Sequence, residues 1–164
     1  MVRYSVIFLT ALIVAALDQL SKAWVKMTIP LHTEVPVIRD FFSLVHVRNR
    51  GAAFGFLDRQ DIEWQFWLFL AATLLAAIVI VILARQSESG EYGFFTGLGL
   101  ILGGAVGNLV DRLQYRAVVD FLDFSYNGWH WPAFNVADIA ICAGAFLAIV
   151  LSWRRKPQRR KNPA

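Results

Sequence analysis

Long apolar stretches separated by short polar segments dominate the pattern of residues along the chain. Four of these stretches, at about residues 5–25, 64–84, 94–113 and 136–153, are long enough to cross roughly 30 Å of hydrocarbon at about 1.5 Å per helical residue. Few charged side chains interrupt them. The pattern therefore predicts four transmembrane helices in a single integral membrane domain, residues 1–164.

Two polar connections contain the remaining predicted elements. In the larger one, the outer loop 26–63, residues 35–38 and 41–48 have the composition and alternation of strands. An apolar run at residues 51–57 is too short to span a bilayer and predicts an interfacial helix. The second connection, residues 114–134, is rich in aromatic residues and is expected to be a loop at the membrane surface. The expected fold class is an all-α membrane protein with four transmembrane helices, a small extracytoplasmic β-sheet and an interfacial helix.

Composition and charge agree with a membrane protein. The chain is 57% hydrophobic and 17% charged, with a mean hydropathy of +0.51, which excludes an ordinary soluble domain. The net charge of +4 does not indicate nucleic acid, because the basic residues lie at helix ends. Six of them follow Trp153 in the basic tail 154–164, so the positive-inside rule predicts that both termini are cytoplasmic. We expect membrane lipid as a partner, no nucleic-acid partner and a monomer.

Acidic side chains near the ends of the predicted helices are the main candidates for chemistry, because ionisable groups at membrane depth are costly and are usually functional. Asp138 lies at the start of the fourth helix, and Asp111, Asp120 and Asp123 precede it. Two carboxyls at short range cannot both ionise easily, so one can act as an acid while the other activates water. Small residues at four-residue spacing should let the last two helices pack closely and bring such a pair together. From spacing alone, Asp111, Asp120 and Asp123 remain alternative partners of Asp138.

Other polar residues near these acids have both a structural and a functional interpretation. Asp18 and Lys22, four residues apart in the first helix, are expected to form a structural ion pair that could also hold a loop. Asp111 and Arg112 are expected to pair and to anchor the end of the third helix. Asn108, on the same helical face as Arg112, could hydrogen-bond a substrate backbone or brace a carboxylate.

Asn135 and the segment that begins at Asn49 also have both a structural and a functional interpretation. Asn135 lies three residues before Asp138 and could brace it as Asn108 could. Asn49, Arg50 and Gly51 begin a segment with a polar head and an apolar body. This segment is either a turn that leads into a membrane-surface helix or a grip on an extended peptide.

Three classes of function remain open at this point. A peptidase would use two acids to activate water, a small proton-coupled transporter would use Asp18, Asp120 and Asp138 as a proton relay, and a membrane scaffold would need none of them. The transporter predicts acids at mid-membrane and related halves, whereas Asp120 and Asp138 lie towards one face and no repeat links the halves. Cys142 is the only cysteine and the histidines lack metal-ligand spacing, so no metal or other cofactor is predicted.

Five motifs, in this order along the chain, resemble those of lipoprotein signal peptidase, also called signal peptidase II, a bacterial membrane aspartic peptidase. The resemblance covers most of the chain, and five ordered motifs are far more specific than any one of them. They are Asp18-Gln19 with Lys22, residues 49–55 (NRGAAFG), residues 103–112 (GGAVGNLVDR), Val119-Asp120-Phe121, and residues 134–138 (FNVAD).

The resemblance implies an aspartic endopeptidase of the bacterial inner membrane, with its active site near the periplasmic face. It implies that diacylglyceryl-modified prolipoproteins are cleaved just before the lipid-bearing cysteine, without a cofactor. Asp120 and Asp138 would then be the catalytic pair. The residues that would bind substrate or support this pair are Asn49, Arg50, Gly51, Asn108, Asp111, Arg112, Asn135, Asp18 and Lys22.

Overall fold

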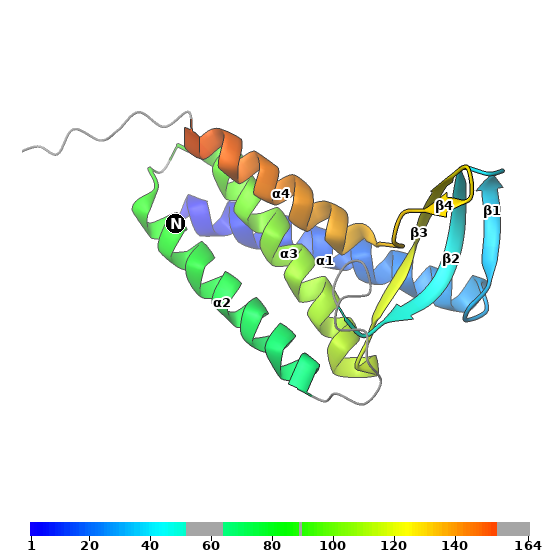
Figure 1. The fold of residues 1–164 in the computed structure, drawn as a ribbon. Coiled ribbons are helices and arrows are strands. Elements are labelled where there is room, and N and C mark those ends of the chain that lie inside the picture. Colours follow the sequence, from blue (N-terminus) through cyan, green and yellow to red (C-terminus); the bar gives the residue numbers. More distant parts are fainter. Residues whose placement is uncertain (52–63, 89, 154–164) are drawn as a thin grey trace, which may run out of the picture.

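Four long helices lie side by side, and a small sheet lies beyond one end of this bundle (Figure 1). The structure is a computed structural model that describes residues 1–51, 64–88 and 90–153. The helices are α1 (Val2–Thr28), α2 (Trp64–Gln86), α3 (Tyr92–Tyr115) and α4 (Val136–Trp153). Each is long and apolar enough to cross a membrane, and each contains one of the predicted apolar stretches.

The sheet has four antiparallel strands in the order β1-β2-β3-β4. The strands are β1 (Glu34–Ile38), β2 (Phe42–Asn49), β3 (Val118–Tyr126) and β4 (Trp129–His130). A mostly helical membrane protein with a small sheet is therefore confirmed. Most of the predicted interfacial helix at 51–57 lies outside the described residues, as does the basic tail 154–164.

The expectation that residues 114–134 form a loop is wrong. The segment contains β3 and β4, joined by a tight turn in which Asn127 has φ 50° and Gly128 has φ 78°. Asn and Gly tolerate positive φ, and an Asn-Gly pair is typical of a two-residue hairpin. The β-branched and aromatic residues of β3 favour a strand, although they are also typical of a membrane surface. The consequence for function is that Asp120 lies on a paired strand, opposite Val47 of β2.

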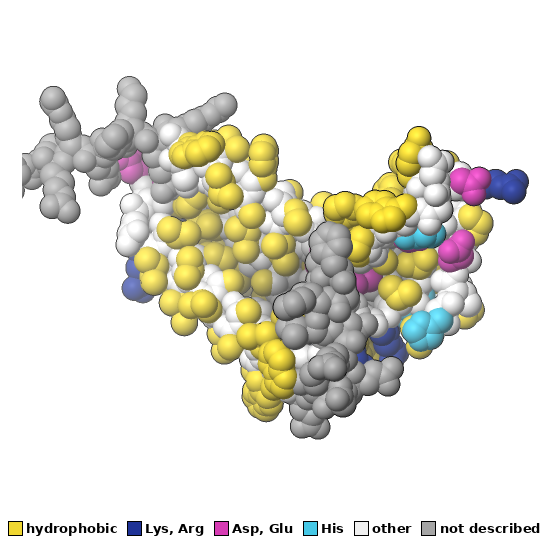
Figure 2. Space-filling view, viewed as in Figure 1, with side chains coloured by type: hydrophobic (Ala, Val, Ile, Leu, Met, Phe, Trp, Pro, Cys, Tyr) yellow, Lys and Arg dark blue, Asp and Glu magenta, His cyan; other side chains and the backbone are white. Residues whose placement is uncertain are grey.

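Apolar side chains cover the visible face of the bundle, whereas the charged and histidine side chains gather towards its ends and the sheet (Figure 2). α2 is apolar on all sides and packs mainly against α3. At the end away from the sheet, Ile7 of α1 and Ile80 of α2 pack with Phe95 and Leu98 of α3. α1 ends at Thr28, two residues before Pro30, which cannot continue a helix.

Glycines on α3 allow its close approach to α1. A Cβ at Gly103 would lie 2.7 Å from the carbonyl oxygen of Ala11, and one at Gly107 would lie 2.6 Å from Oδ2 of Asp18. Small residues let helix backbones approach closely in lipid, where packing rather than water drives association. These two glycines thus fix the distance at which Asp18 meets α3.

A side chain at Gly103 should therefore loosen the bundle. We expect Gly103→Val to lower the free energy of unfolding by about 1–3 kcal/mol, the usual cost of overpacking a tight interface. The measurement is thermal unfolding of the purified protein in detergent. Gly90→Val is the matched control, because no atom of the described residues lies within 4 Å of a Cβ at Gly90. Equal melting temperatures for the two variants would contradict the packing described here.

Candidate active site

Asp120 and Asp138 come from different elements and are held by the same asparagine. Asp120 lies on β3 with 2% of its surface exposed, and the half-buried Asp138 lies in the first turn of α4. The Nδ2 of Asn135 donates to Oδ1 of Asp120 at 2.7 Å, and the backbone N–H of Asn135 donates to Oδ2 of Asp138 at 3.3 Å. One residue therefore sets the relative position of the two carboxyls.

The start of α4 explains why Asp138 is so well oriented. Asn135 immediately precedes the helix, and its Oδ1 accepts from the backbone N–H of Asp138 at 3.0 Å. The carboxyl of Asp138 accepts in turn from the N–H of Asn135. This reciprocal pair is a capping box formed by Asn and Asp. It also places the charge of Asp138 at the helix N-terminus, where negative charge is stabilised.

A second amide binds each carboxyl from another element. Asn49, at the end of β2, donates from Nδ2 to Oδ2 of Asp120 at 3.1 Å. Asn108 of α3 donates from Nδ2 to Oδ1 of Asp138 at 2.8 Å. Each carboxyl thus accepts hydrogen bonds from two amide groups, which fix the orientation of its side chain.

Burial raises the pKa of the Asp120 carboxyl to about 7, because a charged carboxylate loses its hydration in this site. The negative charge of Asp138 raises the pKa of Asp120 further, and the amides of Asn49 and Asn135 lower it by stabilising the ionised form. Asp120 therefore keeps a proton close to neutral pH, where an ordinary aspartate has lost it.

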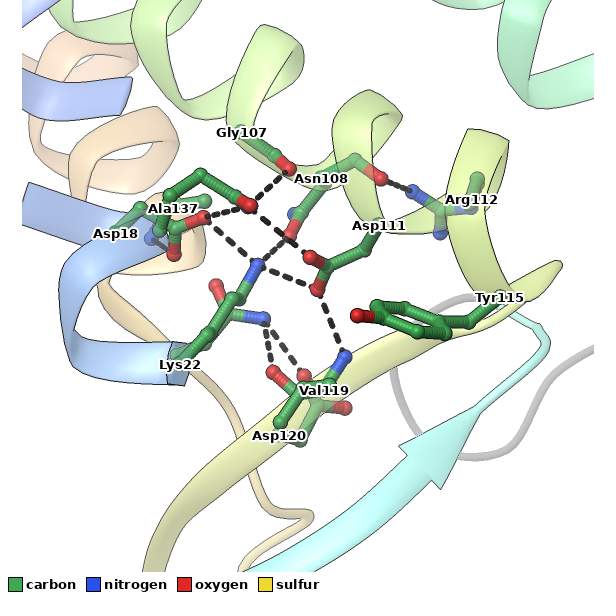
Figure 3. Close-up of polar contacts among 12 residues, drawn as sticks. Asp18, Lys22, Gly107, Asn108, Asp111, Arg112, Tyr115, Val119, Asp120 and Ala137 are labelled. Atoms are coloured by element: carbon green, nitrogen blue, oxygen red, sulfur yellow. Dashed lines mark hydrogen bonds and ion pairs between the residues drawn. The ribbon is translucent and has the colours of Figure 1, made fainter. Parts of the chain in front are cut away.

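A buried network around the Lys22 ammonium lies close to Asp120 (Figure 3). Its Nζ lies 2.8 Å from Oδ2 of Asp18, 3.0 Å from Oδ2 of Asp111 and 2.9 Å from Oδ1 of Asn108. The three charged side chains are fully buried. The expected pair of Asp18 and Lys22 is present, and it has a third and a fourth member on α3.

The expected pairing of Asp111 with Arg112 is wrong. The carboxyl of Asp111 points to α1, where it accepts from Lys22 and, at 3.0 Å, from Nε2 of Gln19. It also accepts from the backbone N–H of Val119 at 3.0 Å, which ties β3 to α3. Neighbouring residues on a helix point in different directions, so the side chains of Asp111 and Arg112 diverge. Gln19 belongs to the first of the five motifs, but the sequence alone does not indicate that it binds Asp111.

Arg112 points instead towards the end of β2. Its Nη2 donates to the carbonyl oxygen of Gly51 at 3.2 Å, and its Cζ lies 3.9 Å from the centre of the Phe69 ring. Its Nε is buried and has no hydrogen-bond partner among the residues that the structure describes. Gly51 is held in turn, since its N–H donates to Oδ1 of Asn49 at 2.9 Å. Arg50 is exposed and does not line the cavity described next.

Asp120 and Asp138 open into a mostly apolar cavity of about 830 Å³ that runs between α2, α3 and α4. Asn49, Asn108 and Arg112 line the same cavity. α2 is apolar on all sides, so the sequence does not show which of its residues line the cavity and which face lipid. Within the described residues, no group of three or more His, Cys, Asp or Glu side chains is placed to hold a metal ion. The apolar lining includes Phe69, Ala72, Ala76, Ile101, Ala105, Ile139, Ile141 and Ala143.

A family model described as signal peptidase (SPase) II matches residues 10–154 of this chain. The chain belongs to the signal peptidase II family. The lipoprotein signal peptidase of Nitratidesulfovibrio vulgaris is 59% identical over 160 residues, which cover 98% of this chain and 96% of the relative. That of Oleidesulfovibrio alaskensis is 55% identical over 154 residues, which cover 94% and 98% respectively.

Solved structures agree with this assignment. A bacterial membrane enzyme determined by the in meso method at 2.3 Å resolution superposes with a TM-score of 0.80 at 26% identity, over 96% of this chain and 93% of that one. A second, at 1.9 Å resolution, gives a TM-score of 0.77 at 28% identity, over 92% and 94%. Family membership thus supports a peptidase that removes signal peptides from lipoproteins in a bacterial inner membrane.

The pKa of Asp120 should be visible as a titration of the folded signal peptidase. An unfolded aspartate loses its proton near 3.8 and Asp120 near 7, so between these values the folded state binds more protons and its stability falls as the pH rises. Infrared difference spectra of wild type minus Asp120→Asn should show a protonated carboxyl band that disappears with a midpoint of about 7. A midpoint near 3.8 would contradict the effect of burial.

Proposed function

We propose that this signal peptidase is an aspartic endopeptidase in which Asp120 and Asp138 activate water. Its substrates are diacylglyceryl-modified prolipoproteins, which it cleaves just before the lipidated cysteine. The observation that carries the proposal is the pair of carboxyls held by Asn135 at the mouth of an apolar cavity between helices. The family supplies the substrate class, and the site supplies the chemistry.

The two carboxyls have different environments, which suits them to different roles. Asp120 keeps its proton to higher pH because it is almost fully buried, so it is the acid. Asp138 lies at the N-terminus of α4 and accepts from Asn108 and Asn135, so it is the base. Pairs of titratable groups whose environments differ in this way supply acid and base in one site.

The proposed reaction needs no covalent intermediate. The Asp138 carboxylate removes a proton from water as the water oxygen attacks the scissile carbonyl carbon, and Asp120 donates its proton to the carbonyl oxygen. The carbon–nitrogen bond of the resulting tetrahedral diol then breaks. Asp138 returns its proton to the nitrogen that leaves with the cysteine, and Asp120 regains one from the diol hydroxyl as the new carboxyl forms. Both acids end in their starting states.

Lys22 acts on this pair through Asn108. An asparagine amide can lie in either of two flipped orientations, and its hydrogen-bond partners decide between them. The Lys22 ammonium donates only, so it requires the Asn108 oxygen on its side. The Asn108 NH₂ group must then face Asp138, to which it donates at 2.8 Å. We therefore assign Lys22, Asp18 and Asp111 as positioning residues rather than catalytic ones.

The cavity suits a lipidated substrate. Two acyl chains contribute about 0.8 kcal/mol per methylene to membrane partitioning, so the scissile bond of such a substrate stays near the membrane surface. The apolar walls of the cavity lie within the bundle, and the acids lie where α3, α4 and the sheet meet. Arg112 lines this wall, and its buried Nε has no partner within the described part of the chain, so we propose that Arg112 donates to a substrate carbonyl.

The sheet end of the bundle is proposed to face the periplasm, with both termini in the cytoplasm. The start of α1 and the end of α4 both lie opposite the sheet (Figure 1). Arg3 is fixed at that end, where it donates to the carbonyl oxygens of Ala84 and Ser87, and the six basic residues after Trp153 follow the same end. Basic residues accumulate on the cytoplasmic side of membrane proteins.

The transporter and the scaffold receive no support from the site. A proton relay would use acids spread through the membrane, whereas Asp18 is neutralised by Lys22, and Lys22 reaches Asp138 only through the amide of Asn108. A scaffold would not need two acids at the mouth of a cavity. Neither alternative accounts for membership of the signal peptidase II family.

Substitution of either acid should abolish cleavage. We expect Asp120→Asn and Asp138→Asn each to slow the cutting of a diacylglyceryl-modified prolipoprotein in detergent by at least about 10²-fold, because each removes one proton-transfer group. Asp123→Asn is the matched control, since Asp123 lies on the same strand but is bound to His130 at 2.8 Å. Each variant is first checked for an unchanged melting profile. Activity in a folded Asp120→Asn or Asp138→Asn variant would refute the catalytic pair.

The proposed orientation can be tested independently of catalysis. Fusion of a fluorescent reporter that matures only in the cytoplasm to the C-terminus should give fluorescent cells. A phosphatase reporter that is active only in the periplasm should be inactive at the same position. The opposite pair of results would reverse the orientation and place the acids at the cytoplasmic face.

A further inference from the structure

Three basic residues lie in the segments that meet where the sheet joins the bundle. They are Lys26 in the last turn of α1, Arg48 on β2 and Arg116 directly after α3. Lys26 and Arg48 share one ring, because Nζ of Lys26 lies 4.7 Å and Cζ of Arg48 lies 5.1 Å from the centre of Tyr115. Nζ of Lys26 also donates to the Tyr115 hydroxyl at 3.1 Å. Figure 2 shows basic side chains at this junction.

Arg116 extends this basic cluster towards α2. It has a left-handed backbone conformation with φ 56°, and its N–H closes α3 on the carbonyl oxygen of Arg112. Its Cζ lies 3.9 Å from the centre of the Phe66 ring, in the first turn of α2. Arg48 and Arg116 are exposed, and Lys26 is half-buried. Aromatic rings therefore hold the charged groups of the cluster in place, while the side chains of Arg48 and Arg116 remain exposed.

No carboxylate neutralises this cluster within the part of the chain that the structure describes. The salt bridges there involve Lys22, Arg39 and His130, but none of the three cluster residues. Lys26 and Arg48 are brought to the same ring although like charges repel. A positive cluster of this kind attracts an anion, and two guanidinium groups match the oxygens of a phosphate.

The location of the cluster points to lipid. Lys26 and Arg116 lie at the ends of two membrane-spanning helices, at the level of the phospholipid headgroups. In the orientation proposed above this is the outer face, where the positive-inside rule leaves basic residues scarce. The positive-inside rule therefore does not explain why three basic residues lie on this face. Asn49 and Arg112 line the active-site cavity and lie on the same elements as the cluster, Asn49 next to Arg48 on β2 and Arg112 in the last turn of α3.

We propose that Lys26, Arg48 and Arg116 bind the phosphate of an anionic phospholipid, with phosphatidylglycerol as the probe. The bound lipid joins the outer ends of α1, β2 and α3, which carry Lys22, Asn49 and Arg112. This inference rests on the position of the cluster in the membrane and is independent of the catalytic pair, so an inactive protein can still show the binding.

The test is competition between phosphatidylglycerol and phosphatidylcholine for the detergent-purified protein, followed by native mass spectrometry. Wild type should retain phosphatidylglycerol in preference to phosphatidylcholine. Arg48→Gln and Arg116→Gln should each lower the retention of phosphatidylglycerol roughly fivefold. Arg39→Gln is the matched control, because Arg39 lies in the turn that leads into β2 and is 95% exposed beside Asp40. It should retain the lipid as wild type does.

A second measurement separates binding from damage to the fold. Phosphatidylglycerol should raise the melting temperature of wild type and of Arg39→Gln, and this rise should be smaller in Arg48→Gln. The three proteins should melt alike in phosphatidylcholine. Equal retention of phosphatidylglycerol by Arg48→Gln and wild type would overturn the proposal. So would displacement of the lipid by inorganic phosphate at equal concentration, since the cluster would then recognise free phosphate.

Discussion

The Lys22 ammonium is the group on which the rest of the site depends. It is fully buried, and the carboxyl groups of Asp18 and Asp111 lie within 3.0 Å of it. Removal of one partner from a buried ion pair typically costs about 3–5 kcal/mol, because the charge that remains has lost its hydration. α1 and α3 are therefore held in one register, and glycines on α3 leave the space that this register requires. The network continues through Asn108 to Asp138.

The two candidate acids are held by two different parts of the structure, the helical bundle and the sheet. Rigid helices hold Asp138 and its supporting network within the bundle, whereas the sheet supplies Asp120 and Asn49 from the membrane surface. Asn135 joins the two parts at the point where α4 begins. The two acids lie at this boundary, and the apolar cavity extends from them into the bundle. The same boundary is where the basic cluster around Tyr115 would bind a phospholipid.

Much of the fold could be predicted from the sequence because lipid imposes strict rules on composition and length. The apolar stretches give the four helices, and the four-residue spacing of Asp18 and Lys22 gives their ion pair. The third member of that network, Asp111, could not be predicted, because the direction of its side chain depends on how α3 is rotated against α1. β3 was missed since its aromatic residues are equally typical of a membrane surface. Spacing left several partners for Asp138, and only the family resemblance selected Asp120.

The most direct test of the catalytic pair is a structure with a prolipoprotein analogue whose scissile amide is replaced by a tetrahedral carbon that bears a hydroxyl. Such a group resembles the intermediate that the site should bind most tightly. If the proposed catalytic pair is correct, the hydroxyl lies within hydrogen-bond distance of both Asp120 and Asp138, with the acyl chains in the cavity between α2, α3 and α4. An analogue bound with its hydroxyl away from either carboxyl would contradict the proposed catalytic pair.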